Sequence, residues 1–236
     1  MGYQFVDCRW ELGNRERGRE LYREEHIPGA SFLDVDTELA DLSVEGEGRH
    51  PLPSAERFAE AAGRAGIGDG VFVIAYGDMG GAERLWWLLR HFGHDDCAVL
   101  DGGLDAWLGP LAGGEEQIEP AVFTPRERGD DTIGAPEIAE RLGDQSLVLV
   151  DARLPARWRG EENPIDKVPG RIPGAINAPW NEALPAMPNG DVVAYCGSGV
   201  TSAVTVHRLA LSGREARLYP GSWSQWETLD LPIERG

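Results

Sequence analysis

Residues 192–202 read Val-Val-Ala-Tyr-Cys-Gly-Ser-Gly-Val-Thr-Ser, an apolar run that stops at a cysteine and passes into a glycine-rich turn. The next segment, residues 202–211, has the pattern of a helix. A strand, a tight loop and the start of a helix form a cradle of backbone N–H groups, to which the helix dipole adds positive potential. The stretch therefore predicts an α/β fold with an anion-binding loop.

The cysteine at the mouth of this loop, Cys196, is predicted to be a thiolate near neutral pH. The N–H groups and the helix dipole both stabilise a negative sulfur, which lowers the pKa of a thiol. Gly197 and Gly199 are expected to adopt backbone dihedrals that a Cβ would forbid. The alternative is an ordinary buried thiol, the common state of a free cysteine. The loop around Cys196 favours the reactive thiolate.

A phosphatase is a rival interpretation that the spacing tests. Cysteine phosphatases place an arginine after the cysteine and five intervening residues, because a guanidinium binds phosphate through two hydrogen bonds. The residue at that position after Cys196 is Ser202. Phosphoester hydrolysis is therefore not expected. The loop is suited instead to hold a second sulfur atom on the sulfur of Cys196.

Composition narrows the class of protein and its partners. The chain has 236 residues, 42% of them hydrophobic and 26% charged, which fits one large globular domain or two of ordinary size. The net charge of −18 argues against nucleic acid or an anionic membrane as a partner. No apolar run approaches the roughly 20 residues of a membrane span, and no leader is recognised, so a cytoplasmic location is expected.

The cysteine count bears on disulfides and metals. Cys8, Cys97 and Cys196 are too few and too scattered for a disulfide scaffold or a thiolate metal cage. The spacing of His91, His94 and Cys97 has some likeness to a metal site, but histidines at the end of an apolar helix interact more often with the helix dipole. No metal and no cofactor are expected.

The second half of the chain repeats features of the first. An apolar run followed by Asp-x-Arg and an Ile-Pro-Gly-Ala motif each occur once in either half. Tyr76 and Tyr195 are 119 residues apart, and so are Trp107 and Trp226. Because two separate elements share one offset, the pattern predicts a duplicated domain.

Each half alternates short apolar runs with helical patterns, which predicts a parallel sheet with helices on both faces. Residues 71–75 and 147–150 are near-continuous apolar runs, typical of buried parallel strands. Residues 83–92 and 136–142 are predicted helices. Ligands of such sheets bind at the carboxyl ends of the strands, where Cys196 lies.

The boundary between the halves is predicted near residue 120, within a segment rich in glycine, proline and acidic residues. The predicted domains are residues 1–120 and residues 121–236. At the position that matches Cys196, the first half has Gly77, so it cannot carry the same chemistry.

The first half is also longer by 25 residues between its Asp-x-Arg motif and its matching tyrosine. The extra length falls around residues 33–57, which include Gly-Arg-His-Pro-Leu-Pro at 48–53. Such an insert is a candidate to reach the site of the other half, or it is a solvated surface loop. The sequence leaves both possibilities open.

The motif Cys-Gly-Ser-Gly-Val-Thr at 196–201 resembles the active-site loop of the rhodanese superfamily, in its mercaptopyruvate sulfurtransferase branch. Residues 219–226, Tyr-Pro-Gly-Ser-Trp-Ser-Gln-Trp, also resemble that branch. The resemblance covers nearly the whole chain and implies two tandem rhodanese-like domains, of which the second is catalytic. It implies transfer of sulfane sulfur from thiosulfate or 3-mercaptopyruvate to cyanide or a thiol through a persulfide on Cys196.

The resemblance also implies roles for individual residues. The family pattern suggests that His50 and Asp36 act with the loop residue Ser198. The persulfide would be held by the N–H groups of the loop, which include those of Gly197, Gly199, Val200 and Thr201.

The donor-binding arginine of the family matches Arg157, in the stretch Arg-Trp-Arg-Gly at 157–160. The branch carries a second arginine nine residues later, where this chain has Asp166 with Lys167 beside it. Lys167 is the expected substitute, although it lacks the planar fork that binds a carboxylate through two hydrogen bonds.

A second class of function shares the same cysteine. A persulfide carrier or a sulfide-sensing protein would deliver sulfur to one protein partner without turnover of its own, and steady-state kinetics with small acceptors would separate the two. Since each half covers its own sheet, a monomer is expected.

Overall fold

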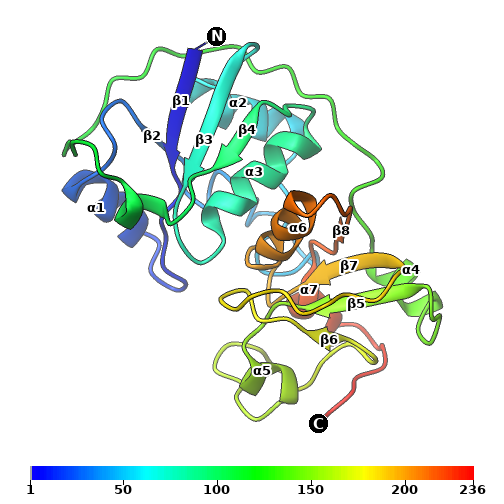
Figure 1. The fold of residues 1–236 in the computed structure, drawn as a ribbon. Helices are drawn as coiled ribbons and strands as arrows, with labels where there is room; N and C mark the ends of the chain where they lie inside the picture. Colours follow the sequence, from blue (N-terminus) through cyan, green and yellow to red (C-terminus); the bar gives the residue numbers. More distant parts are fainter. Residues whose placement is uncertain (1) are drawn as a thin grey trace. The chain divides into compact units, whose positions relative to one another are not determined.

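The computed structural model describes residues 2–236, so Met1, the first residue of the predicted domain 1–120, lies outside the described residues. The chain divides into two compact units (Figure 1). The first unit contains the chain up to Asp41 together with Leu52–Arg128, and the second contains Leu42–Pro51 together with Gly129–Gly236. Part of the insert in the first half therefore belongs to the second unit. The boundary near residue 120 stays a prediction.

The first unit contains a parallel sheet with the strand order β2-β1-β3-β4. Its strands are β1 (Gly2–Asp7), β2 (Ser31–Phe32), β3 (Val71–Tyr76) and β4 (Cys97–Val99). Its helices are α1 (Arg17–Glu24), α2 (Ala55–Arg64), α3 (Gly81–His91) and the short 3₁₀ helix η1 (Gly103–Ala106). The predicted strand at 71–75 and helix at 83–92 are confirmed to within two residues.

The second unit repeats this arrangement, with the strand order β6-β5-β7-β8 in a parallel sheet. Its strands are β5 (Leu147–Asp151), β6 (Ile176–Asn177), β7 (Asp191–Tyr195) and β8 (Arg217–Leu218). Its helices are α4 (Ala135–Glu140), α5 (Pro155–Arg159), α6 (Ser202–Leu211) and α7 (Ser222–Trp226). The identical strand orders confirm the duplicated domain.

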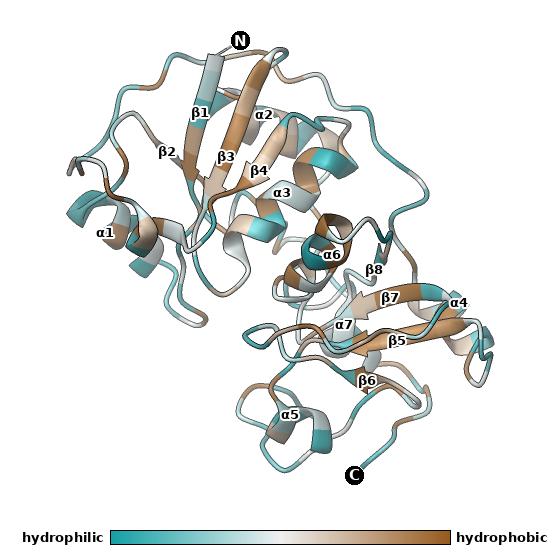
Figure 2. Ribbon diagram, viewed as in Figure 1, coloured by the Kyte–Doolittle hydropathy of each residue, from teal (hydrophilic) through white to brown (hydrophobic). Residues whose placement is uncertain are grey.

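In the central strands of the second unit, successive apolar side chains point to alternate faces of the sheet, and both faces are buried. Leu149 and Val193 pack in one apolar cluster with residues of α4 and α7. Their neighbours Val150 and Val192 pack in a second cluster with Leu209 of α6. Successive side chains of a strand point to opposite faces, so helices cover both faces as predicted. In Figure 2, β5 and β7 are accordingly coloured as hydrophobic over most of their length.

The two Asp-x-Arg motifs form equivalent buried ion pairs where β1 and β5 end. Arg9 donates to Asp7 with an Nη2–Oδ2 distance of 2.6 Å, and Arg153 donates to Asp151 with an Nη2–Oδ2 distance of 2.7 Å. Each carboxylate also accepts the backbone N–H of its arginine. These aspartates therefore fix the turn that leaves each strand, which makes them structural residues.

None of the helices within residues 2–236 has both the length and the apolar character that a membrane span requires.

Candidate active site

Cys196 lies directly after β7 and begins the loop that leads into α6 (Ser202–Leu211). Residues 222–224, which follow β8, hydrogen-bond to the backbone of this loop. The backbone N–H of Trp223 donates to the carbonyl of Cys196 at 3.0 Å, and that of Ser224 donates to the carbonyl of Gly197 at 2.9 Å. The hydroxyl of Ser222 accepts the N–H of Cys196 at 3.1 Å. These contacts occupy the carbonyls of Cys196 and Gly197 and the N–H of Cys196, whereas the N–H of Gly199, further along the loop, faces the sulfur.

The sulfur of Cys196 lies among hydrogen-bond donors. The N–H of Gly199 donates to Sγ at 3.1 Å. Burial raises the pKa of the Cys196 thiol, but the hydroxyls of Ser202 and Thr201 and the N–H groups of Ser198 and Ser202 outweigh burial, so the pKa is lowered. The start of α6 adds the positive end of a ten-residue helix to this environment. The predicted direction of the pKa shift is confirmed.

The two loop glycines are required for different reasons. Gly199 has φ +83°, and a Cβ there would lie 2.5 Å from the carbonyl oxygen of Pro220. Gly197 is outside the left-handed region, so the expectation of a forbidden dihedral at Gly197 is wrong. A Cβ at Gly197 would instead lie 2.9 Å from Nη2 of Arg49 and 3.0 Å from Nη2 of Arg157. Glycine therefore leaves room at that position for two guanidinium groups.

His50 of the insert lies in the second unit and contacts the loop. Its Nδ1 and the Oγ of Ser198 share a hydrogen bond of 2.7 Å, and both residues are buried. The backbone N–H of Arg49 donates to Oγ of Ser224 at 2.9 Å, which fixes the segment beside α7. Gly48, at φ +93°, is close enough that a Cβ would lie 2.6 Å from the carbonyl oxygen of Gly221. Residues 42–51 are therefore packed into the second unit rather than a free surface loop.

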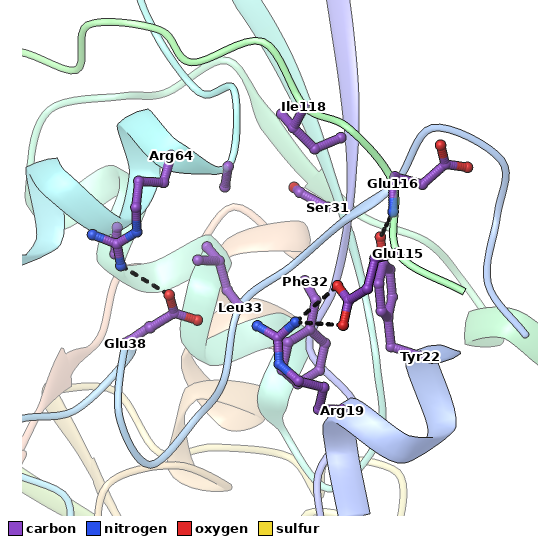
Figure 3. Close-up of a pocket in the computed structure, with 12 residues that line it drawn as sticks. Arg19, Tyr22, Ser31, Phe32, Leu33, Glu38, Arg64, Glu115, Glu116 and Ile118 are labelled. Atoms are coloured by element: carbon purple, nitrogen blue, oxygen red, sulfur yellow. Dashed lines mark hydrogen bonds and ion pairs between the residues drawn. The ribbon is translucent and has the colours of Figure 1, made fainter. Parts of the chain in front are cut away.

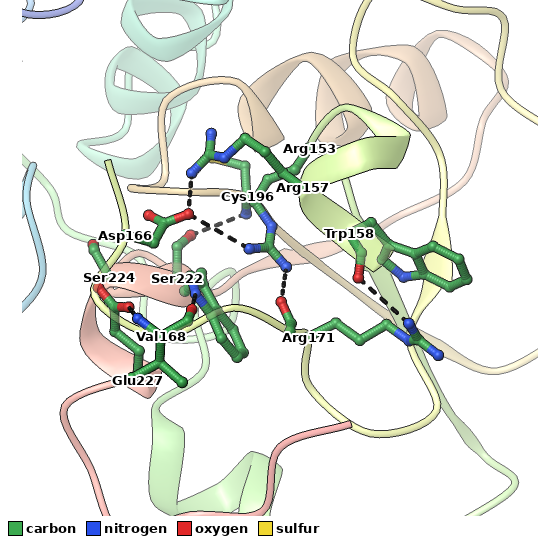
Figure 4. Close-up of polar contacts among 12 residues, drawn as sticks. Arg153, Arg157, Trp158, Asp166, Val168, Arg171, Cys196, Ser222, Ser224 and Glu227 are labelled. Atoms are coloured by element: carbon green, nitrogen blue, oxygen red, sulfur yellow. Dashed lines mark hydrogen bonds and ion pairs between the residues drawn. The ribbon is translucent and has the colours of Figure 1, made fainter. Parts of the chain in front are cut away.

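A buried carboxylate joins three arginines beside the loop. Oδ1 of Asp166 accepts a hydrogen bond of 2.8 Å from Nη1 of Arg49, and Oδ2 accepts one of 2.5 Å from Nη2 of Arg157. Nη1 of Arg153 lies 3.7 Å from the same Oδ2. Figure 4 shows Asp166 between Arg153 and Arg157, close to Cys196. Positive charge is thus gathered at the loop of a strongly acidic protein.

Most of the predicted site residues lie in the second unit: Cys196, Gly197, Ser198, Gly199, Val200, Thr201, His50 and Arg157. Lys167 is exposed, and across residues 2–236 no polar contact joins it to the loop. Asp36 is buried within the first unit. The sequence interpretation missed Arg49, Ser222 and Ser224. The signal for Arg49 was its place next to His50 in the insert.

The other two cysteines have the opposite environment. Burial and nearby carboxylates raise the pKa of Cys8 well above its ordinary value. Burial raises the pKa of Cys97 to about 12. Within the described part of the chain, Cys196 is therefore the cysteine whose thiolate is stabilised. No group of three histidine, cysteine or acidic side chains in this part is arranged to hold a metal ion.

The first unit contains a cavity of about 280 Å³ (Figure 3). Four of its five charged lining residues pair with one another, Arg19 with Glu115 at 2.9 Å and Arg64 with Glu38 at 2.9 Å, and the fifth, Glu116, lies 3.4 Å from Nε2 of His26. Since opposite charges compensate each other there, this cavity offers an anionic ligand less than the loop at Cys196 does.

The family of the chain follows from its match to known domains. The model of the rhodanese-like domain matches residues 2–109 and again residues 134–229. These two stretches contain the two parallel sheets, and the second contains the Cys196 loop. The chain belongs to the rhodanese family and carries two rhodanese-like domains, as the sequence motifs predicted.

Individual relatives agree with this assignment. The chain is 38% identical to a putative thiosulfate sulfurtransferase, SseB, of Mycobacterium tuberculosis, over 98% of this chain and 90% of the relative. It is 36% identical to human 3-mercaptopyruvate sulfurtransferase, over 94% of this chain and 84% of the relative.

Two solved structures are also similar. The 3-mercaptopyruvate sulfurtransferase from Leishmania major matches with a TM-score of 0.83 and 29% identity, over 97% of this chain and 71% of that one. SseA from Escherichia coli, whose structure is described as that of a 3-mercaptopyruvate sulfotransferase, matches with a TM-score of 0.81 and 28% identity, over 94% and 93% of the two chains.

Because the pKa of Cys196 is lowered, its thiolate should form at a lower pH than the thiolate of an ordinary cysteine does. We expect the ultraviolet thiolate absorbance of Cys196 to develop at a lower pH than that of an ordinary free cysteine. Cys8 and Cys97 do not interfere, because their pKa values are raised. In Ser202→Ala the midpoint should rise, since a nearby hydroxyl that lowers the pKa of the thiol is lost while burial remains.

The matched control for this titration is Thr205→Ala, which removes a buried hydroxyl one turn further along α6. It should leave the midpoint unchanged, because Thr205 is not among the groups that stabilise the thiolate. Equal shifts in the two variants would show that Ser202 has no particular effect on the sulfur.

Proposed function

We propose that the protein is a sulfurtransferase that moves sulfane sulfur from thiosulfate or 3-mercaptopyruvate to cyanide or a thiol. The observation that carries the proposal is a cysteine of lowered pKa at the end of β7, in a loop of N–H donors beside two arginines. The names of the relatives, which include both thiosulfate and 3-mercaptopyruvate sulfurtransferases, support the same activity.

In the first step, the Cys196 thiolate attacks the outer sulfur of thiosulfate. A new S–S bond forms, the S–S bond of the donor breaks, and sulfite leaves with the electron pair. Covalent catalysis of this kind divides one transfer into two easier steps. The loop N–H groups stabilise the terminal sulfur of the persulfide as they stabilise the thiolate. Cyanide or a thiolate then attacks that sulfur and regenerates the Cys196 thiolate.

With 3-mercaptopyruvate the donor sulfur carries a proton. The thiolate of Cys196 attacks this sulfur, the C–S bond breaks, and the enolate of pyruvate leaves with the electron pair. Ser198 and His50, joined by their 2.7 Å hydrogen bond, transfer the thiol proton toward the enolate carbon. Arg157 is proposed to bind the carboxylate of the donor.

His50→Gln should therefore distinguish the two donors. Loss of general acid–base catalysis typically lowers rates by about a hundredfold or more, so kcat with 3-mercaptopyruvate should fall by at least roughly tenfold even with partial compensation by water. The rate with thiosulfate should change much less, because sulfite leaves without a proton. Equal losses with both donors would contradict the relay and indicate a structural role of His50.

The function itself is tested by two measurements on the wild-type protein. The first is cyanide-dependent turnover with thiosulfate and with 3-mercaptopyruvate. The second is the mass of the peptide that contains Cys196 after incubation with donor alone, which should increase by one sulfur atom. Loading without turnover would favour the persulfide carrier. No loading by either donor would overturn the proposal.

A cytoplasmic location and a monomeric state are also proposed. All three cysteines are free, which suits a reducing compartment where disulfides are rare. Each unit contains its own complete sheet of four strands, so neither sheet needs a partner chain to complete it.

A further inference from the structure

Residues 42–51, here called segment 42–51, carry His50 to the site but form neither a helix nor a strand. His50 lies near the end of the segment, is 3% exposed and shares its 2.7 Å hydrogen bond with Ser198. Residues 43–47, which precede it, are exposed. An exposed stretch without regular structure has many conformations available to it. Contacts from outside the segment are therefore needed to fix the position of His50.

Ser224 of α7 connects segment 42–51 to the Cys196 loop. Its backbone N–H donates to the carbonyl of Gly197 at 2.9 Å, while its Oγ accepts the N–H of Arg49 at 2.9 Å. The same hydroxyl donates to the carbonyl of Gly221 at 3.2 Å, which leaves its oxygen to act as the acceptor toward Arg49. One buried residue thus binds the loop through its backbone and the segment through its side chain.

Gln225, the next residue of α7, binds the same segment closer to its start. Its Nε2 donates to the carbonyl of Gly46 at 3.1 Å and to Oε2 of Glu47 at 2.8 Å. The hydroxyl of Tyr219, which is 1% exposed, donates to Oε1 of the same amide at 2.8 Å. Because Tyr219 binds the amide oxygen, the amide nitrogen faces the segment.

Gly48 lies between these two attachment points and allows the segment to approach α7 closely. Its φ is +93°, and a Cβ there would lie 2.6 Å from the carbonyl oxygen of Gly221 and 2.9 Å from Oγ of Ser224. The backbone of the segment therefore packs directly against the start of α7. At the same place Ser222 accepts the N–H of Cys196 at 3.1 Å. One short helix thus fixes both the nucleophile and the segment that carries His50.

We propose that Ser224 and Gln225 are positioning residues that place His50 against Ser198 by holding segment 42–51 on α7. This inference rests on the proposed sulfurtransferase function and names what keeps its proton-transfer pair in place. Neither residue is among the groups that lower the pKa of Cys196, so their effect on the reaction passes through His50. Since 3-mercaptopyruvate requires the proton transfer and thiosulfate does not, loss of the positioning should affect the two donors differently.

Ser224→Ala removes the acceptor of the Arg49 N–H but keeps the backbone donor to Gly197. Segment 42–51 should then open more often, and trypsin should cleave the Arg49–His50 bond about three- to tenfold faster, the change expected from one hydrogen bond. The turnover number kcat with 3-mercaptopyruvate should fall by about the same factor, because a small displacement of an acid–base group slows proton transfer. With thiosulfate kcat should stay within about twofold, and the thiolate titration of Cys196 should not change.

Gln225→Glu is a second variant whose effect can be reversed. It keeps the acceptor of Tyr219, but it removes both hydrogen bonds to the segment and places a carboxylate against Glu47. Cleavage and kcat with 3-mercaptopyruvate should change as in Ser224→Ala. Adding Glu47→Gln exchanges the amide and the carboxylate, so that the hydrogen bond between them forms again. Both quantities should then return most of the way to the wild-type values, which a general loss of stability would not allow.

The matched control is Thr228→Ala, which removes an exposed hydroxyl that donates to the carbonyl of Gln225 at 2.7 Å rather than to segment 42–51. It should leave cleavage and both kcat values within about twofold. The inference is wrong if Ser224→Ala and Gln225→Glu behave like this control. It is equally wrong if they lower kcat with both donors by the same factor, or if cleavage accelerates while kcat with 3-mercaptopyruvate is unchanged.

Failure of the inference can be told apart from failure of the function, because the cleavage assay needs no turnover. If the wild type is loaded with sulfur and the variants keep its kcat with 3-mercaptopyruvate, only the roles of Ser224 and Gln225 are wrong. If the wild type is not loaded by either donor, the function is wrong, and so is the role of His50 that these residues serve. If Ser224→Ala does not fold, Gln225→Glu and its reversal by Glu47→Gln still decide the question, because both of these side chains reach the surface.

Discussion

Cys196→Ser is expected to lower kcat/KM by at least about a thousandfold with both thiosulfate and 3-mercaptopyruvate. A serine hydroxyl is not ionised near neutral pH, and the oxygen cannot form a persulfide. The loop N–H groups and the two arginines remain, so donor binding should persist while sulfur transfer stops. Cyanide-dependent turnover measures the loss, and the mass of the peptide with residue 196 should show no added sulfur.

The control for this substitution is Cys97→Ser. Cys97 is half-buried in the first unit, and its raised pKa keeps it a neutral thiol. This variant should keep turnover within about twofold of wild type, and sulfur should still map to Cys196. Activity of Cys196→Ser above a tenth of wild type would mean that another group accepts the sulfur, and the mechanism proposed for the loop would then be wrong.

The backbone of the site could be predicted from the sequence because its signals are local. The helix predicted at 202–211 has the same bounds in the structure, Ser202–Leu211. An apolar run that stops at Cys196 and a pair of glycines define strand, loop and helix within twenty residues. The repeated motifs then assigned the same arrangement to both halves, and the identical strand orders confirm it.

The side chains around the loop could not be predicted in the same way. Arg49 and Asp166 are 117 residues apart, and their ion pair depends on how residues 42–51 pack in the second unit. From the sequence, position 166 was interpreted as the place where the second arginine of the family is missing, and Lys167 as the residue that replaces it. In three dimensions the carboxylate of Asp166 binds two arginines instead. For the same reason the sequence analysis explained Gly197 by its backbone dihedrals. The structure explains it by the guanidinium groups of Arg49 and Arg157, which leave no room for a Cβ.

Gly199→Ala is the second substitution with a large expected effect. The backbone at Gly199 has φ +83°, which costs an alanine about 1–2 kcal/mol. In addition, the new Cβ would lie 2.5 Å from the carbonyl oxygen of Pro220, a backbone atom, so the loop must move. The N–H that donates to Sγ of Cys196 at 3.1 Å then moves with it. Loss of one such donor typically costs about a hundredfold or more in kcat.

Gly213→Ala is the control that separates the effect of backbone strain from the effect of moving the Cys196 loop. Gly213 has φ +75°, nearly the same backbone conformation, but no atom lies within 4 Å of its Cβ position. Both variants should lose stability in thermal unfolding, Gly213→Ala by about 1 kcal/mol and Gly199→Ala by more. Only Gly199→Ala should lose turnover and raise the pKa of Cys196, because only there does the strain fall on a donor to the sulfur. If Gly213→Ala lost as much activity, general destabilisation would explain both results. If Gly199→Ala kept full turnover, the hydrogen bond from this N–H would not contribute to catalysis, and the thiolate would depend on the helix and the hydroxyls alone.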